Sequence, residues 1–157
     1  MRIVYLGTGD IGLPVLERLL TSPEHTVLGV VTQPDKPVGR RQEMHASPVK
    51  QLALRFHVPI FQPAKIREPS AVAQIQFLRP DVIVVMAYGQ ILPRVVLNIP
   101  TVACLNLHAS LLPRHRGAAP IQAAILAGDR DSGVTVMYMA EGLDTGDILL
   151  KRSFRLG

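Results

Sequence analysis

The chain has 157 residues, 48% of them hydrophobic and 18% charged, which fits one globular domain with an ordinary core and excludes a disordered chain. Its net charge of +5 permits a polyanionic partner such as nucleic acid but does not require one. No apolar run approaches the roughly 18 residues of a membrane span, and the N-terminal apolar stretch is too short for a signal peptide. The single Cys104 cannot form an internal disulfide, so we expect a cytoplasmic protein without a membrane partner.

Short apolar runs alternate with amphipathic runs along the chain. Strands are predicted at 2–6, 26–32, 58–61, 81–87, 102–107, 133–139 and 148–154. Helices are predicted at 13–20, 47–57, 68–78, 91–97 and 119–127. Between 33 and 46, Pro34, Pro37 and Gly39 predict a loop without regular structure. Repeated β-α-β units with unbroken apolar strands predict an α/β fold with a doubly wound, mostly parallel sheet, and the last two strands predict an antiparallel C-terminal hairpin.

A G-x-G-x-x-G pattern, Gly7 to Gly12, follows the first predicted strand and precedes the first predicted helix. That context is typical of phosphate binding at a helix N-terminus, and an NAD-binding oxidoreductase is one hypothesis. A dinucleotide site also needs an acidic residue at the end of the second strand, where this chain has Thr32 and Gln33. Asp10 would moreover place a negative charge beside the pyrophosphate. A tight turn is therefore the competing interpretation of the pattern.

Asn106 and His108 close a predicted strand, and because they are two residues apart they share one face of it. The carboxyl end of such a strand opens into the crevice where parallel sheets bind ligands. Asp144 lies in the turn Gly142 to Asp147. Each residue alone fits an ordinary strand end or turn, but the three together suit one kind of chemistry.

That chemistry is acyl transfer to an amine without a covalent intermediate. A neutral amine is already a nucleophile, so no Ser or Cys is needed. The negative charge on the tetrahedral oxygen can be stabilised by the amide of Asn106 and the imidazole of His108. A nearby carboxylate such as Asp144 can favour the cationic form of the histidine or relay protons through water.

With these residues in view, the sequence resembles the formyltetrahydrofolate-dependent formyltransferases, over its whole length. The motifs are Asn106-x-His108, the turn Ser110 to Pro113 and the segment LDTGDILLK that contains Asp144. The resemblance implies a Rossmann-like catalytic domain over 1–157 in which Asn106, His108 and Asp144 are catalytic. It implies 10-formyltetrahydrofolate as formyl donor and no metal. It also implies that folate contacts come from Ser110, Leu111, Leu112, Pro113, Ala87, Tyr88, Gly89, Gln90, Ile91, Leu92, Ala140, Glu141, Gly142 and Leu143.

Within the family, the segments TQPDKPVGR, SPVK and RGAAPIQ are similar to the members that formylate the α-amino group of methionyl initiator tRNA. In those members the insertion at 33–46 reaches the acceptor end of the tRNA, and its basic residues fit that role. The residue at 115 is His where we expect a larger aromatic, and the C-terminal β-barrel of the tRNA-specific members is expected to be absent from this truncated, monomeric chain. The expected tRNA contacts are Lys36, Arg40, Arg41, Arg114 and Arg116.

Three other functions compete with this hypothesis. Formylation of a small amine, such as glycinamide ribonucleotide or an amino-sugar nucleotide, uses the same chemistry but does not need a long basic loop. An NAD-dependent oxidoreductase rests only on the glycine pattern, which in formyltransferases with phosphorylated substrates falls at a phosphate site. A non-catalytic RNA-binding module explains the charge but not the Asn106, His108 and Asp144 set, and few aromatics are present for stacking on bases.

Overall fold

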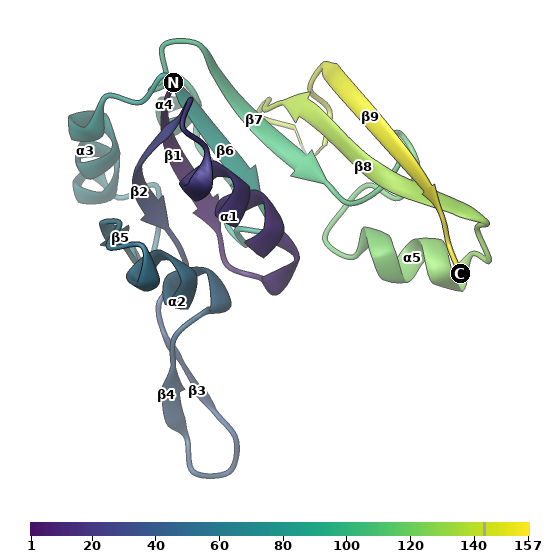
Figure 1. Cartoon of the computed structure of the whole chain (residues 1–157), viewed down its shortest axis with the longest axis horizontal. Helices are drawn as coiled ribbons and strands as arrows, with labels where there is room; N and C mark the ends of the chain where they lie inside the picture. Colours follow the sequence, from purple (N-terminus) through teal and green to yellow (C-terminus); the bar gives the residue numbers. More distant parts are fainter. Residues whose placement is uncertain (143) are drawn as a thin grey trace.

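A computed structural model describes residues 1–142 and 144–157 and shows a seven-stranded sheet with helices on both faces (Figure 1). Its five parallel strands are followed by two antiparallel ones at the C-terminal edge. The predicted α/β fold and the antiparallel C-terminal hairpin are therefore confirmed. The spatial order is β5 (Ile60–Phe61), β2 (Thr26–Val31), β1 (Arg2–Gly7), β6 (Val82–Met86), β7 (Ala103–His108), β8 (Asp131–Tyr138) and β9 (Ile148–Arg155).

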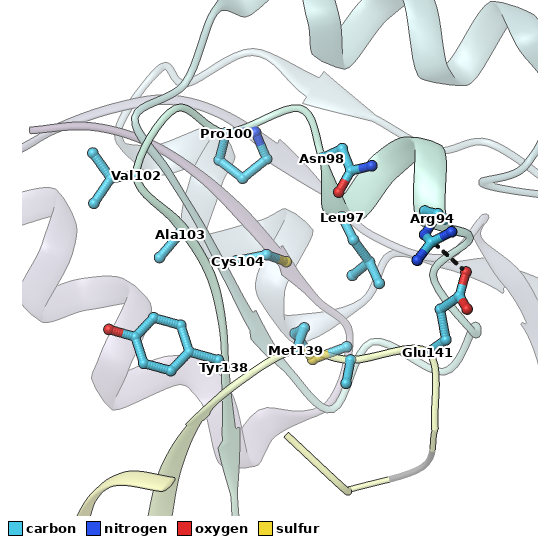
Figure 2. Close-up of a pocket in the computed structure, with 11 residues that line it drawn as sticks. Arg94, Leu97, Asn98, Pro100, Val102, Ala103, Cys104, Tyr138, Met139 and Glu141 are labelled. Carbon is cyan, nitrogen blue, oxygen red and sulfur yellow. Dashed lines mark ion pairs between the residues drawn. The ribbon is translucent and has the colours of Figure 1, made fainter. Parts of the chain in front are cut away.

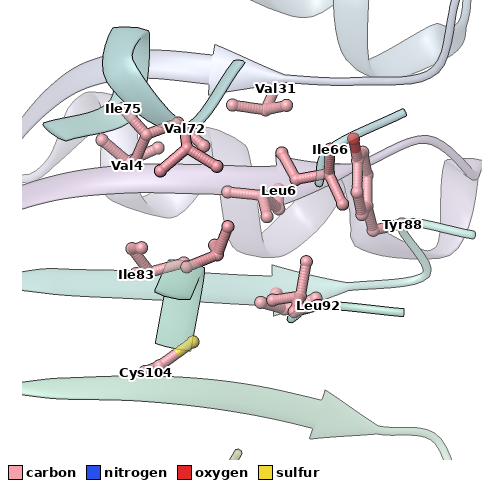
Figure 3. Packing of buried hydrophobic residues seen from close by; sticks show 12 residues of the cluster. Val4, Leu6, Val31, Ile66, Val72, Ile75, Ile83, Tyr88, Leu92 and Cys104 are labelled. Atoms are coloured by element: carbon pink, nitrogen blue, oxygen red, sulfur yellow. The ribbon is translucent and has the colours of Figure 1, made fainter. Parts of the chain in front are cut away.

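The helices divide between the two faces of the sheet. α1 (Leu13–Thr21) and α2 (Pro48–Arg55) pack on one face, where Leu16 and Leu52 join one buried cluster. α3 (Pro69–Leu78) and α4 (Arg94–Leu97) pack on the other, where Ile75 and Val96 join a second cluster (Figure 3). α5 (Pro120–Leu126) connects β7 to β8. None of the helices in the described part of the chain is long and apolar enough to cross a membrane.

The central strand β6 is buried at every position, as expected for a strand covered on both faces. Ile83 and Val85 lie in the cluster under α3 and α4, whereas Val82 and Val84 lie in the cluster under α1 and α2. Cys104 of β7 joins the first cluster and is 7% exposed, so its interpretation as a core residue is confirmed.

The segment predicted as an irregular loop contains a hairpin, so that prediction was wrong. β3 (Lys36–Val38) and β4 (Glu43–His45) form a separate two-stranded antiparallel ribbon that projects from the body of the molecule near α2 (Figure 1). Pro37 pairs with Met44, and a ribbon with two free edges tolerates a proline that donates no hydrogen bond. Gly39 and Gln42 both have positive φ, so they allow the chain to reverse between the strands.

Other helix boundaries follow local chemistry. The Ser47 hydroxyl accepts a hydrogen bond from the Lys50 N–H at 3.0 Å, so α2 begins where the sequence predicts. The helix predicted at 91–97 is shorter: it begins at Arg94, with Pro93 as an extended N-cap. A residue before a proline is disfavoured in the α conformation, which keeps Leu92 out of the helix.

The glycine pattern after β1 is explained by packing against Tyr5. The Tyr5 hydroxyl donates to the Gly12 carbonyl at 3.2 Å, and a Cβ on Gly12 would lie 2.1 Å from that oxygen. A Cβ on Gly7 would lie 2.6 Å from the Tyr5 ring. Gly9 has room, because a Cβ there would meet its nearest atom at 3.7 Å. Two of the three glycines are thus needed for close packing of the turn on a buried tyrosine.

We therefore expect Gly12→Ala to destabilise the fold by about 1–3 kcal/mol through overpacking against Tyr5. Gly9→Ala, the matched control, should change stability by no more than about 0.5 kcal/mol. Urea unfolding followed by circular dichroism measures both. Equal losses in the two variants would contradict the assignment of the pattern to packing.

Candidate active site

Asn106 and His108 lie at the carboxyl end of β7, the last parallel strand of the sheet. β7 pairs with β6 on one side and with antiparallel β8 on the other, where Asn106 lies opposite Met137 and His108 opposite Thr135. Because side chains alternate along a strand, both residues share the face of Cys104, which packs in the cluster under α3 and α4. Asn106 is half-buried and His108 is buried.

The fold brings His108 and Asp144 together from distant parts of the sequence. Nδ1 of His108 lies 3.5 Å from Oδ1 of Asp144, and the two side chains are only 7% and 6% exposed. The second carboxylate oxygen of Asp144 accepts a hydrogen bond from the Gly117 N–H at 2.9 Å. Asp144 itself has a φ of 51°, so its backbone adopts the left-handed conformation that aspartate tolerates better than most residues.

The other ring nitrogen of His108 is also engaged. Nε2 lies 2.9 Å from the backbone carbonyl oxygen of His115. A carbonyl can only accept, so Nε2 carries a hydrogen in this arrangement. His108 therefore lies between two acceptors, the Asp144 carboxylate and the His115 carbonyl.

The turn that follows β7 is fixed from inside the protein. The Ser110 hydroxyl donates to the Arg114 carbonyl at 2.7 Å. Thr135 of β8 donates its hydroxyl to the Ser110 carbonyl at 2.7 Å and accepts from the Leu112 N–H at 3.1 Å. The Lys151 ammonium of β9 donates to the Leu112 carbonyl. Ser110 and Leu112 are buried, whereas Leu111 is half-buried and Pro113 exposed.

A second group of charged side chains holds the same turn from outside. Oδ1 of Asp129 lies 2.7 Å from Nη2 of Arg114, and Oδ2 lies 2.6 Å from Nε2 of His115. The hydrogen bond from His115, followed by that from Arg114, lowers the pKa of Asp129 below its usual range although partial burial opposes the shift. Asp129 follows α5, and its N–H donates to the Ala124 carbonyl at 3.1 Å, so it is anchored to the end of a helix.

A hollow of about 630 Å³ lies between α4 and the β7–β8 pair (Figure 2). Cys104 and Met139 lie in its wall, and Arg94 of α4 forms an ion pair of 3.5 Å with Glu141 across one side. Burial raises the pKa of the Cys104 thiol to about 12, which keeps it protonated and unsuited to nucleophilic chemistry. The hollow is lined by Arg94, Leu97, Asn98, Pro100, Val102, Ala103, Cys104, Tyr138, Met139, Ala140 and Glu141.

Of the folate contacts expected from the resemblance, Ala140 and Glu141 line this hollow, and Gly142 follows them and is exposed. Leu143 lies outside the described residues. In the 87–92 segment, Tyr88 and Leu92 are core residues, so only their backbone can meet a ligand (Figure 3). Ala87, Gly89 and Ile91 are exposed, with Ile91 84% accessible.

Gln90 and Gln33 fix the 87–92 segment to neighbouring loops. The Gln90 amide accepts from the Ile66 N–H at 2.7 Å and donates to the Gln33 amide oxygen at 3.0 Å. Gln33 in turn donates to the Tyr88 carbonyl at 3.3 Å, and the Thr8 hydroxyl donates to the same carbonyl at 2.9 Å. Thr32 and Gln33 stand where a dinucleotide site needs an acidic residue, and both are used inside the protein, since the Thr32 hydroxyl also lies 2.9 Å from the Ser47 hydroxyl.

The basic residues expected to contact tRNA lie in two places. Lys36, Arg40 and Arg41 are exposed on the β3–β4 hairpin, and Arg116 is exposed in the turn after β7. Arg114 is 63% exposed and already paired with Asp129. Arg114 and Arg116 thus lie in the turn that follows His108, whereas the other three lie on a separate projecting ribbon (Figure 1).

The base of the hairpin is held by Asp35. Its carboxylate lies 2.8 Å from the Lys50 ammonium and accepts from the Gln62 amide at 2.8 Å. The hydrogen bond from Lys50, then that from Gln62, lowers the pKa of Asp35. The positive charge of Lys50 is therefore paired with Asp35 at the base of the hairpin.

Sequence reasoning missed several residues of the site. Asp129 follows a glycine and looks like any turn aspartate, and Thr135 is a single polar residue inside an apolar strand. Neither carries a signal of its distance from His108, because that distance depends on how β8 pairs with β7. No group of three or more His, Cys, Asp or Glu side chains within residues 1–142 and 144–157 is arranged to hold a metal ion.

Comparisons with known sequences all point to formyltransferases. The model of the formyl transferase family matches residues 1–156. A methionyl-tRNA formyltransferase of Magnetococcus marinus is 61% identical over 145 residues, which cover 92% of this chain and 46% of that relative. The enzyme of the same name from Methylacidiphilum infernorum is 53% identical over 150 residues, which cover 96% and 47%. The chain spans about half the length of the curated relatives it matches.

Solved structures with the same fold include a phosphoribosylglycinamide formyltransferase from Bacillus halodurans, with a TM-score of 0.79 and 22% identity over 100% of this chain and 81% of that one. A sugar N-formyltransferase from a Shewanella species has a TM-score of 0.68 and 19% identity, and the match covers 100% of this chain and 58% of that one. At these identities the likeness concerns the fold alone.

The lowered pKa of Asp35 predicts a pH-dependent contribution to stability. A depressed carboxyl pKa stabilises the fold above the unfolded value of about 4, and this stabilisation is lost as the pH falls through the folded value. Wild type should therefore melt at a higher temperature than Asp35→Asn at pH 7, and this difference should shrink at pH 3. Thermal unfolding at both pH values measures it, and a difference that does not change with pH would contradict the ion pair's role.

Proposed function

Because the chain belongs to the formyl transferase family, we propose that it carries the catalytic site for transfer of a formyl group from 10-formyltetrahydrofolate to the α-amino group of methionyl initiator tRNA. Relatives named methionyl-tRNA formyltransferase, at 51–61% identity, support this acceptor. The observation that carries the proposal is the buried contact of His108 with Asp144, at 3.5 Å, beside Asn106 at the end of β7. In this proposal the chain corresponds to the catalytic half of those relatives.

The reaction needs stabilisation of charge and no protein nucleophile. The acceptor amine attacks the formyl carbon, a new C–N bond forms, and the carbonyl oxygen becomes an oxyanion. Collapse of this intermediate breaks the bond to the folate nitrogen, which takes up a proton while the amine loses one. Asn106 donates its amide N–H to the oxyanion, and His108 donates Nε2–H after the oxygen replaces the His115 carbonyl as acceptor. Asp144 holds the opposite side of the imidazole ring.

The hollow between α4 and the β7–β8 pair is suited to the donor. It reaches Cys104, which lies on the same face of β7 as Asn106 and two residues before it, a distance of about 6.6 Å along a strand. A flat heterocycle in the hollow would thus have its formyl group near Asn106. Leu97, Cys104 and Met139 supply apolar wall, and the exposed backbone after β8 supplies hydrogen-bonding groups.

The β3–β4 hairpin is suited to a large polyanionic acceptor. Lys36, Arg40 and Arg41 are exposed on a ribbon that projects from the domain, and such cations interact with phosphates without reading sequence. The runner-up acceptor is a small amine, as the names of the solved neighbours suggest for those proteins. Parallel assays with methionyl-tRNA, glycinamide ribonucleotide and an amino-sugar nucleotide distinguish the two. Turnover of a small amine alone would overturn the tRNA assignment.

Asn106→Ala removes one donor to the oxyanion, so it should lower the turnover number by about 10²–10³-fold. Binding of a stable 10-formylfolate analogue should persist, because the substitution leaves the hollow intact. Turnover with methionyl-tRNA and calorimetric titration with the analogue measure the two effects. Near-normal turnover would refute the role of Asn106, and loss of analogue binding would place Asn106 in the donor site instead.

Ala140→Phe tests the position of the donor. Ala140 is exposed at the rim of the hollow, so a phenyl ring there should fill space needed by the heterocycle and weaken analogue binding at least tenfold, a change of about 1.4 kcal/mol. Ala127→Phe adds the same ring at an exposed position after α5 and should leave binding unchanged. Equal affinity in Ala140→Phe, wild type and the control would place the donor outside the hollow.

A further inference from the structure

The Arg114–Gly117 turn holds both members of the buried pair. The His115 carbonyl accepts from Nε2 of His108 at 2.9 Å. Two residues later, the Gly117 N–H donates to Oδ2 of Asp144 at 2.9 Å. A shift of this turn would therefore move the hydrogen-bond partners of His108 and of Asp144 together.

The turn is fixed to the rest of the protein by two anchors. One is the Ser110 hydroxyl, which is completely buried and donates to the Arg114 carbonyl. The other is the carboxylate of Asp129, which is 10% exposed and contacts the Arg114 guanidinium at 2.7 Å and the His115 ring at 2.6 Å. Charge-assisted hydrogen bonds of this length are among the stronger polar contacts in proteins.

The backbone of Asp129 is itself held at the end of α5. Gly128 ends α5 with a φ of 69°, and the Asp129 N–H closes onto the Ala124 carbonyl. β8 begins two residues later at Asp131 and pairs with β7 beside His108. These contacts connect the backbone of Asp129 to the strand pair that carries the imidazole.

We propose that Asp129 is a positioning residue for the His108–Asp144 pair, acting through His115 and Arg114 on the turn whose backbone contacts both residues. This inference rests on the proposed function for its catalytic meaning, but not for its geometry. Asp129 contacts neither donor nor acceptor in this assignment. It determines where the His115 carbonyl meets Nε2–H, and hence how the ring is held before an oxyanion takes the place of that carbonyl.

The contact of Asp129 with residue 115 depends on a side chain that can donate a hydrogen bond. A histidine can donate Nε2–H to a carboxylate, which an apolar aromatic ring of similar size cannot. His115 is 17% exposed, against 63% for Arg114, so the histidine arm is the better shielded of the two contacts. The anchor should therefore depend more on His115 than on Arg114.

Nuclear magnetic resonance of the ¹⁵N-histidine-labelled chain tests the proposal without any substrate. An imidazole N–H that is hydrogen-bonded in a buried site exchanges slowly with water, so the Nε2–H of His108 should give a downfield signal, assigned by its loss in His108→Asn. In Asp129→Asn and in His115→Ala, exchange of this proton should accelerate at least about tenfold, as expected on losing a charge-assisted hydrogen bond. His115→Gln, which can still donate to Asp129, should restore slow exchange.

The control is Asp131→Asn, which makes the same change two residues further along, at an exposed position. It should leave the His108 signal unchanged, and thermal unfolding should show that all variants remain folded. Slow exchange that persists in folded Asp129→Asn and His115→Ala would overturn the proposal, because Ser110 and the backbone contacts of the turn would then hold it without Asp129.

Turnover supplies an independent readout. Asp129→Asn should lower the turnover number with the KM for the donor unchanged, whereas a rise in turnover would overturn the proposal by showing that the anchored turn blocks the site. One combination separates the two proposals: the His108 proton exchanges faster in Asp129→Asn, but Asn106→Ala keeps full activity. That result would support the positioning contact and refute the proposed function. The two failures are thus distinguishable.

Discussion

The contact between His108 and Asp144 is buried on both sides, and buried polar side chains are tolerated only when their hydrogen-bonding positions are filled. Two backbone groups of the turn after β7 do this: the His115 carbonyl faces Nε2 of His108, and the Gly117 N–H faces Oδ2 of Asp144. The position of that turn is therefore a condition for the pair. Ser110, Thr135 and Asp129 hold that segment in place. Much of the polar structure at this end of β7 therefore supports the contact between His108 and Asp144.

The place of the pair follows from the change of strand direction in the sheet. β7 is the last parallel strand, and β8 runs antiparallel to it. The chain therefore leaves β8 beside the start of β7, where it passes Cys104 and turns back. The hollow forms at this return, beside Cys104 and Met139, and Asp144 comes a few residues later. A fully parallel sheet would send the chain away from this edge into a crossover helix. The antiparallel strands thus allow one continuous segment to line the hollow and to supply the carboxylate.

The hairpin β3–β4 obeys a different constraint. It makes its own two-stranded ribbon, shares none of the buried clusters and is held at its base by Asp35, Lys50 and Gln62. An isolated two-stranded ribbon is only marginally stable in water, which suits a surface that orders on a partner. In the proposed function, the rigid sheet carries the chemistry and this ribbon carries the charge that meets the acceptor.

Local sequence determined much of the fold. The unbroken apolar run at β6, the Ser47 cap and the alternation that places Asn106 and His108 on one face depend on neighbours in the chain, so they could be predicted from residue types and spacing alone. The hairpin could not, because Pro37 and Gly39 are compatible with both a loop and a two-stranded ribbon, and pairing with β4 decides between them. The sequence groups Asn106, His108 and Asp144 because their chemistry suits one reaction, and the structure brings His108 and Asp144 into contact; their catalytic role stays a prediction. Only the tertiary structure decided that His108 lies between Asp144 and the His115 carbonyl, and that Asp129 anchors the turn, because those distances depend on strand pairing and loop closure between segments far apart in the chain.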